Sequence, residues 1–395
     1  MRVLVVGVGL QGRAVVHDLE RTAAVTEVVA ADLDARIAAA ELERLGCRKA
    51  HSVHLDATDG DRLPGAVRGL HPHVVVCMVP PQLQVAVARA ALAAGAHFVS
   101  TSYAGGVAEL HAEAEQQGLV LLPEMGFDPG IDLVMARAAV GSLDEVHGLH
   151  MYGGGIPDAV AADNPLHYKV TWTFDGVLQA YRRPARVLRD GTEVAIPGER
   201  IFEAQHTATV DVPGVGTLEA YPNGDAVHYR ELYGLGPALR DLGRFALRWP
   251  GHCALWRTMS ALGFLDAEPV RVSGAGVLPV QFTARLLEPR LQYAAGERDL
   301  AILRVRAWGK KGGAKRSVVL DLLDRRDLGT GLFAMNRTVG YTASIGVQLI
   351  LDGTITRPGL RHPARDVPPE RLFAELRERG IEVSGPGMAA GIDRG

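Results

Sequence analysis

The chain has 395 residues, and its 42 lysines and arginines against 45 aspartates and glutamates leave a formal net charge of −3. This balance lacks the positive footprint of a protein that coats nucleic acid. A composition of 47% hydrophobic and 22% charged residues is ordinary for a globular protein and excludes a disordered one.

The cysteines and the N-terminus indicate the compartment. The 3 cysteines form no C-x-x-C pair, which favours a reducing environment over a disulfide scaffold. The first apolar run, Val3 to Leu10, is interrupted by glycines, and no stretch approaches the roughly 20 apolar residues of a membrane span. We therefore expect a soluble cytoplasmic protein with no membrane or nucleic-acid partner.

Strand and helix signals alternate over the first 125 residues. Apolar strand segments are expected at Val3–Val6, Val28–Ala31, His51–Leu55, Val74–Val79, His97–Ser100 and Leu119–Leu122. Helical spacing separates them at Leu10–Leu19, Ile37–Leu45 and Gln82–Ala94. Such βαβ units predict an α/β fold with a parallel, dinucleotide-binding sheet of the Rossmann type over residues 1–127.

The pattern of expected strands and helices changes after Pro129. Residues 128–335 read as a mixed α+β domain for substrate binding and dimerisation, with strand-like segments such as His167–Phe174. Ile302–Ala307 and Val318–Leu323 are expected to pair around a turn at Lys310–Gly313. Residues 336–395 are expected to add helices that return to the nucleotide domain, including an amphipathic helix at Pro368–Arg379.

A G-x-G-x-x-G fingerprint follows the first strand and opens a helix. Its glycines have three tasks: the tight turn, the close approach of a pyrophosphate to the backbone, and helix–sheet packing. An acidic residue stands 20 positions after the last glycine, as the ribose site requires. The cofactor-binding residues expected here are Gly7, Gly9, Leu10, Gln11, Gly12 and Asp32.

The charge of Asp32 predicts the choice of cofactor. A carboxylate at this place accepts hydrogen bonds from a 2′-hydroxyl and repels a 2′-phosphate, which favours NAD over NADP. Asp34 is the alternative residue for binding the ribose. Arg36 lies close enough in sequence to reach the same part of the cofactor. Further along, Asp56 ends the third strand, where a side chain reaches the adenine. Val79 and Pro80 end the fourth strand at the ligand crevice.

Three further segments are candidate functional motifs. They are Thr101-Ser102-Tyr103, the run Glu124-Met125-Gly126-Phe127-Asp128-Pro129-Gly130-Ile131-Asp132, and Gly153–Pro157 followed by Asn164-Pro165-Leu166-His167-Tyr168-Lys169. At these residues, and at Tyr221-Pro222-Asn223, Leu247–His252 and Thr338–Tyr341, the chain resembles the saccharopine dehydrogenase family, in its L-glutamate-forming branch. It is also similar to lysine 6-dehydrogenases around Leu247–His252.

The resemblance implies a homodimer and hydride chemistry at a C–N bond of a small amino-acid substrate. It also implies that Thr101, Ser102, Phe127, Asp128 and Pro129 line the nicotinamide end of the cofactor. Substrate would touch Ser102, Tyr103, Asp128, Tyr168 and Arg248, and the catalytic candidates are Lys169, Asp128 and Tyr103. Oxidation of an amine requires a group that takes a proton, first from the ammonium and later from water.

Each of these residues has a plainer interpretation. Asp128 before Pro129 suits the N-cap of a helix. Tyr103 suits an ordinary ring at a strand end. Lys169 lies in a strand-like segment between aromatic residues, where its pKa can fall enough for a base, or where it can simply face solvent. His167 is the second candidate base, although surface exposure suits it as well. The 14 histidines show no metal-ligand spacing, so no metal is expected.

Two positions depart from the family pattern. The saccharopine enzymes carry an arginine after Tyr-Pro-Asn to hold a substrate carboxylate, and here Gly224 stands in its place. The histidine of the family after Gly-Ile-Asp is replaced by Leu133. Arg230 or Arg248 is expected to supply the missing charge. Three hypotheses follow: an enzyme of the saccharopine dehydrogenase type, an ε-deaminating lysine dehydrogenase, and a nucleotide-binding relative without catalysis.

Overall fold

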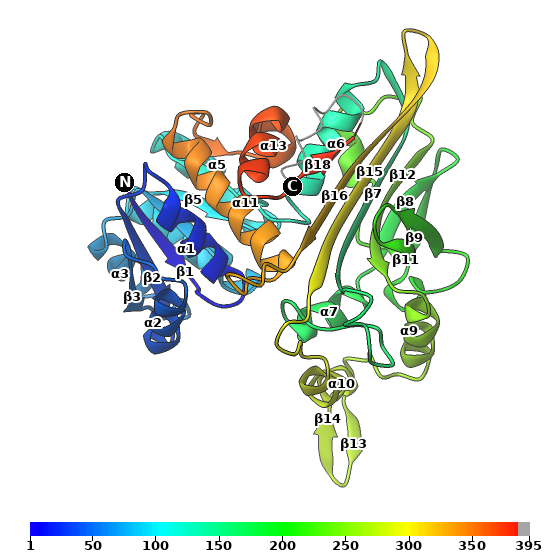
Figure 1. Ribbon diagram of the computed structural model, residues 1–395, viewed down its shortest axis with the longest axis horizontal. Helices are drawn as coiled ribbons and strands as arrows, with labels where there is room; N and C mark the ends of the chain where they lie inside the picture. The colour runs from blue at the N-terminus through cyan, green and yellow to red at the C-terminus, as the bar shows by residue number, and fades with distance from the viewer. Residues whose placement is uncertain (386–395) are drawn as a thin grey trace. The chain divides into compact units, whose positions relative to one another are not determined.

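The computed structural model describes residues 1–385, which form two compact units (Figure 1). The first unit combines Met1–Val134 with Gly329–Ile381, and the second combines Met135–Leu328 with the residues from Glu382 onward. The last ten residues of the expected C-terminal segment, 386–395, lie outside the described residues. The division of roles between the segments 1–127, 128–335 and 336–395 stays a prediction.

The first unit is built on a parallel sheet of seven strands in the order β17-β6-β5-β4-β1-β2-β3. The strands are β1 (Arg2–Val6), β2 (Glu27–Asp32), β3 (Ala50–His54), β4 (Val74–Cys77), β5 (His97–Ser100), β6 (Val120–Leu122) and β17 (Gly359–Leu360). Valine-rich strands such as β1 and β4 are buried on both faces, as central parallel strands must be. The strand order reverses at β1 and β4, which confirms the Rossmann fold expected from the sequence.

Helices pack against this sheet. They are α1 (Gly12–Arg21), α2 (Ala35–Arg44), α3 (Leu63–Gly69), α4 (Gln84–Ala93), α5 (His111–Gln116), α11 (Ala334–Leu351), α12 (Pro363–Asp366) and α13 (Pro369–Glu378), while α6 (Ile131–Gly141) runs across the limit between the units. Gly340 on α11 has no room for a side chain, because a Cβ there would lie 2.6 Å from Ala14 Cβ on α1. This glycine therefore lets the two helices pack closely.

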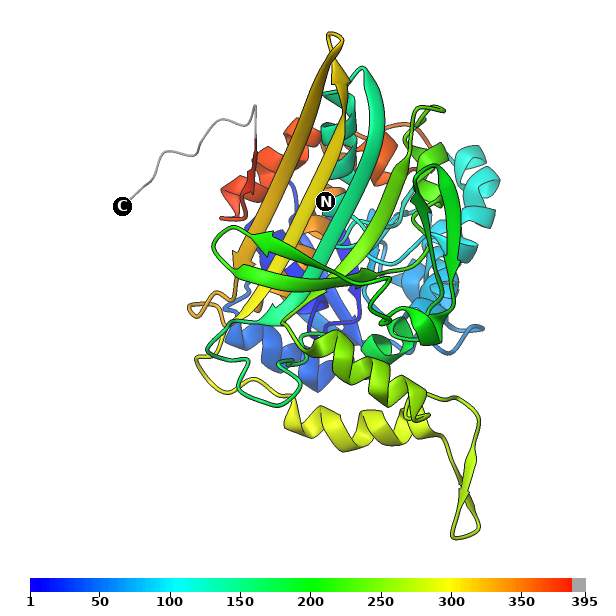
Figure 2. The ribbon, with the colours of Figure 1, turned by 90° about the vertical axis from the view of Figure 1, so that its right-hand side faces the viewer.

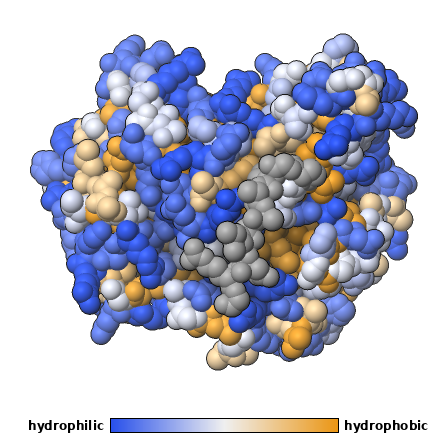
Figure 3. Space-filling view, turned by 45° about the horizontal axis from the view of Figure 1, so that its top comes forward, coloured by the Kyte–Doolittle hydropathy of each residue, from blue (hydrophilic) through white to orange (hydrophobic). Residues whose placement is uncertain are grey.

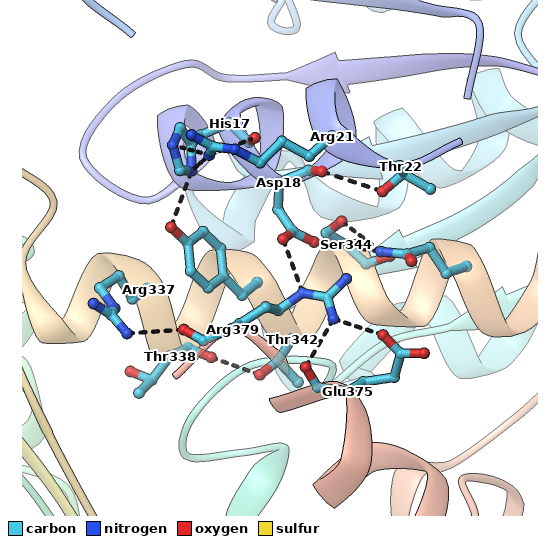
Figure 4. Close-up of polar contacts among 12 residues, drawn as sticks. His17, Asp18, Arg21, Thr22, Arg337, Thr338, Thr342, Ser344, Glu375 and Arg379 are labelled. Atoms are coloured by element: carbon cyan, nitrogen blue, oxygen red, sulfur yellow. Dashed lines mark hydrogen bonds and ion pairs between the residues drawn. The ribbon is translucent and has the colours of Figure 1, made fainter. Parts of the chain in front are cut away.

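A buried polar network joins α1, α11 and α13 (Figure 4). Arg379 Nε donates to Asp18 Oδ1 at 2.8 Å, and its Nη1 donates to Glu375 Oε2 at 2.6 Å. His17 lies against the Arg21 guanidinium, and its Nδ1 is 2.9 Å from Tyr341 Oη. The C-terminal helix is thus tied to the nucleotide-binding unit by charge as well as by its buried apolar stripe.

The second unit is built on a mixed sheet of nine strands (Figure 2). They are β7 (Glu145–Pro157), β8 (Ala185–Arg189), β9 (Thr192–Ile196), β10 (Ala208–Val212), β11 (Gly216–Pro222), β12 (Asp241–Arg248), β15 (Asp299–Lys311), β16 (Ala314–Arg325) and β18 (Val383–Ser384). The expected hairpin around Lys310–Gly313 is confirmed, because β15 and β16 pair antiparallel from Leu300↔Arg325 to Lys311↔Ala314. The strands β7, β15 and β16 lie side by side as the longest in Figure 2.

Four helices complete this unit, and an aromatic core lies beneath them. The helices are α7 (Phe174–Ala180), α8 (His228–Leu232), α9 (His252–Ala261) and α10 (Pro279–Leu287), and a separate hairpin consists of β13 (Val270–Val272) and β14 (Ala275–Val277). The core contains Tyr168, Tyr181, Phe202, Tyr221 and Trp256. On the face drawn in Figure 3, hydrophilic residues predominate and hydrophobic ones lie in small groups between them. Among the described residues, no helix is long and apolar enough to cross a membrane.

Candidate functional site

The glycine loop between β1 and α1 has the geometry of a dinucleotide cradle. Gly7 adopts φ +95°, and its N–H donates to Ala31 O at 2.8 Å. A Cβ at Gly12 would lie 1.9 Å from Gly7 O, so a side chain there is impossible. A Cβ at Gly9 would meet nothing within 4 Å, which leaves open space in front of the loop. This is the space into which a pyrophosphate fits against the start of the helix.

The carboxylate of Asp32, which the sequence predicts beside the glycine loop, is hydrogen-bonded to that loop. Its Oδ2 accepts from Val8 N–H at 2.7 Å and its Oδ1 from Asp34 N–H at 3.2 Å. Asp34 caps α2 and pairs with Arg36, whose guanidinium is 3.0 Å away. The hydrogen bond from the Arg36 side chain lowers the pKa of Asp34. The Arg36 side chain is 91% exposed, so a ligand can reach its guanidinium beside Asp34.

Other predicted cofactor residues follow the carboxyl ends of the strands. Val79 comes after β4, and a Cβ at Gly7 would lie 3.1 Å from its Cγ1, so this strand end borders the cradle. Pro80 is exposed beside it. Asp56 follows β3, where its Oδ1 accepts from Thr58 N–H and Oγ1, and these bonds lower its pKa. Thr101 and Ser102 follow β5, both half-buried, and Leu10 of the glycine loop is exposed.

The segment around Asp128 forms a tight loop and not a helix start. The Asp128–Pro129 peptide is cis, Gly126 N–H donates to Pro129 O at 3.1 Å, and Ile131 N–H donates back to Gly126 O at 3.0 Å. Helix α6 begins only at Ile131, so the expectation that Asp128 caps a helix with Pro129 in its first turn is wrong. Phe127 and Pro129 are buried, and Asp128 is half-buried.

The carboxylate of Asp132 is hydrogen-bonded to the backbone of this loop. It is 2% exposed, and its Oδ1 accepts from Gly130 N–H at 2.8 Å. Burial raises the pKa of Asp132 to about 7, with a contribution from the negative charge of Glu124. The neighbouring Leu133 is fully buried, as expected for an apolar replacement of the family histidine.

The segment that carries Tyr168 and Lys169 is a loop, contrary to the strand-like interpretation of the sequence. Asn164 explains the difference. Its side chain accepts from Leu166 N–H at 3.0 Å and donates to Tyr168 O at 2.8 Å, and so satisfies backbone groups that a strand partner would otherwise bind. His167 is exposed in this loop with φ +46°.

Lys169 is buried and paired with two carboxylates. Its Nζ lies 2.7 Å from Glu297 Oε1 and 3.0 Å from Asp163 Oδ1. Burial by itself lowers the pKa of Lys169, but the hydrogen bonds and charges of Glu297 and Asp163 outweigh burial and raise it. The expectation of a lowered pKa is therefore not met, because Glu297, 128 residues away along the chain, could not be recognised as the partner from sequence.

Arg248 lies in a box of aromatic rings within the second unit. Its guanidinium carbon is 5.2 Å from the ring centre of Tyr168, 6.0 Å from that of Tyr181 and 5.8 Å from that of Tyr221. Its Nη1 donates to Leu247 O at 2.7 Å. Arg248 is 8% exposed, and no carboxylate of residues 1–385 lies within ion-pair distance of it. A buried cation without an anion is costly, and the site therefore suits an anionic ligand group.

The rest of the box is uncharged. Burial raises the pKa of Tyr221 to about 12, although the charge of Arg248 opposes it, and the pKa values of Tyr168 and Tyr181 are raised for the same reason. Burial and the Arg248 charge lower the pKa of His252 well below its ordinary value. Arg248 thus supplies the positive charge of the box. The pattern Leu247–His252 indicated Arg248, but not the rings from three distant segments around it.

The backbone at Gly224 favours glycine, although a side chain there would meet only an ordinary contact. It adopts φ +73°, which favours glycine, and a Cβ there would lie 3.7 Å from Arg183 Cδ. Arg230, the other expected substitute cation, is exposed on α8. Tyr103 is 40% exposed at the end of β5 in the first unit. Among the described residues, no group of three or more histidine, cysteine, aspartate or glutamate side chains could hold a metal ion.

Comparisons with known proteins fit both units. Residues 3–122 match the family model described as the saccharopine dehydrogenase NADP binding domain, and residues 126–381 match that of the saccharopine dehydrogenase C-terminal domain. The chain belongs to the saccharopine dehydrogenase family. The resemblance inferred from the sequence is thereby confirmed.

Several relatives of the family are similar over different lengths. The saccharopine dehydrogenase [NADP(+), L-glutamate-forming] of Pyricularia oryzae is 26% identical over 407 residues, which cover 85% of this chain and 89% of that protein. The alpha-aminoadipic semialdehyde synthase of Arabidopsis thaliana is 31% identical over 236 residues, or 58% of this chain and 22% of that much longer protein. The solved apo saccharopine dehydrogenase (L-Glu forming) of Saccharomyces cerevisiae shares the fold, with a TM-score of 0.85, 24% identity and coverage of 98% of this chain and 100% of that one.

The expectation of NAD as the cofactor of this saccharopine dehydrogenase family member is wrong. The matching N-terminal model is that of an NADP binding domain, and the fungal relatives are named as NADP(+) enzymes. The repulsion argument failed because Asp32 is turned onto the backbone N–H groups of Val8 and Asp34, which partly neutralise its charge. The residues present fit NADP: the glycine loop for the pyrophosphate, and exposed Arg36 for the 2′-phosphate.

Two residues that the sequence interpretation missed are Gln84 and Glu124. Both contact the backbone of the loop that carries Ser102 and Tyr103. Glu124 was quoted only as the first letter of a motif, and Gln84 follows a Pro-Pro pair without any recognisable signal of its own. Only the alignment of neighbouring strand ends brings them together.

Proposed function

We propose that the chain is an NADP-dependent oxidoreductase that acts on a C–N bond of saccharopine or another lysine-derived amino acid. The observation that carries the proposal is Arg248, a buried guanidinium without a carboxylate partner among residues 1–385. An amino-acid substrate brings the carboxylate that this cation lacks. The names of the fungal relatives, which are saccharopine dehydrogenases, support the choice of substrate.

The residues of each unit have separate tasks in this proposal. Bound NADP⁺ supplies the hydride acceptor. In the first unit, Asp128 and Tyr103 are the proposed proton acceptors for the amine and for the water that adds to the iminium. In the second unit, Lys169 is kept as an ammonium by Glu297 and Asp163, so we assign it an electrostatic role and not that of a base.

An ε-deaminating lysine dehydrogenase is the second candidate, and Gly224 favours it. Saccharopine has several carboxylates, whereas lysine has one. Without an arginine at position 224, Arg248 is the buried cation available for a single carboxylate, with exposed Arg183 beside the glycine. The two candidates therefore differ in the number of acids that the second unit must hold.

The function is tested by offering the purified protein NADP⁺ with saccharopine, lysine and 1,5-diaminopentane, and following NADPH absorbance. Oxidation of saccharopine or lysine, and none of the diamine that lacks a carboxylate, is the expected result. Binding of NADP⁺ without oxidation of any amine would instead identify a nucleotide-binding relative without this activity.

An Arg36→Ala variant should lose at least about tenfold in NADP⁺ affinity while its NAD⁺ affinity changes little, because only NADP⁺ carries the 2′-phosphate. Arg62→Ala, another exposed arginine of the same unit, is the matched control.

We also propose that the protein is a homodimer joined through the sheet of the second unit. A half-exposed aromatic cluster supports this: His150 and Trp308 rings lie 4.9 Å apart, Tyr152 and Phe245 rings 5.1 Å apart, and Arg306 covers Trp308. Such aromatic and arginine side chains are typical of interface centres. Light scattering should give about twice 42.2 kDa, and Trp308→Glu should reduce it to the mass of one chain. A mass of 42.2 kDa for the unmodified protein at all concentrations would contradict the proposal.

A further inference from the structure

Four neighbouring strand ends in the first unit are joined by side-chain hydrogen bonds and one histidine–carboxylate contact. The strands β17, β6, β5 and β4 lie next to one another in the sheet, and all run parallel. The chain that follows β4 leads to Gln84, that after β6 to Glu124, and that after β17 to His362. The side chains of Gln84 and Glu124 contact the loop after β5, residues 101–104, and His362 contacts Glu124. We call Gln84, Glu124 and His362 the edge brace.

Gln84 fixes one side of this loop. Its Nε2 donates to Tyr103 O at 2.9 Å, and its Oε1 accepts from Ser100 Oγ at 2.7 Å. Gln84 is 4% exposed and Ser100 is fully buried. A buried amide is expensive unless its hydrogen bonds are made, so the side chain has little freedom to leave the loop.

Glu124 fixes the other side. Its backbone N–H donates to Ser102 O at 3.0 Å, and its Oε1 accepts from Ala104 N–H at 3.0 Å. Glu124 is 6% exposed and adopts φ +64°, a left-handed conformation that is unfavourable for a non-glycine residue. A strained, buried glutamate is a poor choice for stability alone, and strain of this kind gathers at functional sites.

His362 completes the brace from the C-terminal part of the chain. Its Nδ1 accepts from Ala364 N–H at 3.1 Å, so that nitrogen carries no proton. The ring proton of the neutral form therefore sits on Nε2, which faces Glu124 Oε2 at 3.3 Å. His362 Nε2 thus lies within ion-pair distance of the carboxylate that holds the loop, and links β17 to it.

We propose that Gln84, Glu124 and His362 are positioning residues, which set the backbone of residues 101–104 so that Thr101, Ser102 and Tyr103 can present their side chains to ligand. The assignment of ligands to this loop rests on the proposed function. Gln84 and Glu124 bind the backbone of the loop, in which Ser102 is half-buried and Tyr103 is exposed. The residues of the edge brace act through the loop and touch no reacting atom.

The test compares His362→Ala with His362→Gln, because the glutamine amide can replace the Nε2–H donor and alanine cannot. We expect His362→Ala and Glu124→Gln each to weaken NADP⁺ binding in calorimetry by about five- to twentyfold, and to raise KM more than they lower kcat. His362→Gln should recover most of the loss. His111→Gln is the matched control, because His111 Nδ1 likewise accepts a backbone N–H of β17, from Leu360 at 2.9 Å, and its side-chain partners all lie outside residues 101–104.

Two results would overturn the proposal. One is unchanged NADP⁺ affinity in His362→Ala and Glu124→Gln, whether or not the melting temperature falls. The other is a loss of equal size in His111→Gln, which would indicate a general effect on the sheet edge. If Glu124→Gln does not fold, the half-buried His362 pair still decides the question. Should the unmodified protein bind NADP⁺ but oxidise no amine, the proposed function fails while the binding measurements still test the brace.

Discussion

Replacing Arg248 with methionine should lower kcat/KM for the amino-acid substrate by roughly 30- to 1,000-fold, which corresponds to about 2–4 kcal/mol for a buried charge pair. The same variant should melt no lower than the unmodified protein, because an unpaired buried cation costs stability and an apolar side chain of similar length does not. Steady-state kinetics and a melting curve measure the two effects. Their opposite directions separate ligand binding from folding.

The carboxylate itself can be varied to sharpen this test. The unmodified enzyme should prefer lysine to 1,5-diaminopentane strongly, and Arg248→Met should nearly abolish that preference, since only lysine offers a carboxylate to the guanidinium. Arg248→Lys keeps the charge but not the planar fork, and should fall between the two. Arg304→Met is the control, because Arg304 on β15 already has its own partner, Asp321, at 2.9 Å. If Arg248→Met keeps the preference, the carboxylate binds elsewhere.

The glycine loop and the strand end that carries Asp32 could be predicted from sequence because both are local. Gly7, Gly12 and Asp32 lie within one βαβ unit, and their spacing alone fixes the turn, the helix start and the second strand end. What the spacing could not give is the direction of the Asp32 carboxylate, which is turned onto Val8 N–H. The choice of NAD rested on the charge of Asp32 alone, and the match to an NADP binding domain shows that this choice was wrong.

The surroundings of the two candidate cations in the second unit could not be predicted from sequence. Lys169 is paired with Glu297, and Arg248 is surrounded by rings from residues 168, 181 and 221, so each environment is assembled from distant segments. The sequence identified both cations but not their surroundings. A lysine was therefore expected to lose its proton more easily, whereas its carboxylate partners hold the proton more tightly.

A substitution in the buried polar network of α1 and α13 should strongly lower the free energy of unfolding (Figure 4). Arg379→Met removes the positive charge that pairs with Asp18 at 2.8 Å, and leaves that carboxylate buried. Breaking a buried pair on one side costs about 3–5 kcal/mol, so the free energy of unfolding should fall by that amount at pH 7. The double variant Asp18→Asn with Arg379→Met should recover most of the loss, because position 18 is then uncharged and Glu375 keeps its ion pair with Arg371 at 2.8 Å.

The pH dependence of this loss follows from the pKa of Asp18. Burial raises that pKa above its ordinary value in the folded protein, and the charge of Arg379 opposes the rise. Because the folded pKa is the higher one, the stability that Asp18 contributes is present in its protonated state and is lost as pH rises through the folded pKa. Arg379→Met raises the folded pKa further, so its deficit should shrink as the pH is lowered from about 7 toward 5.

Denaturation can locate this effect in one unit. The 4 tryptophans, Trp172, Trp249, Trp256 and Trp308, all belong to the second unit, so their fluorescence reports on that unit, whereas circular dichroism reports on both. We expect Arg379→Met to shift the dichroism transition to lower urea concentration at pH 7. If the units unfold separately, the fluorescence transition should stay in place. A stability loss below about 1 kcal/mol at pH 7, or one that grows as the pH falls, would mean that Asp18 does not depend on Arg379 for its charge.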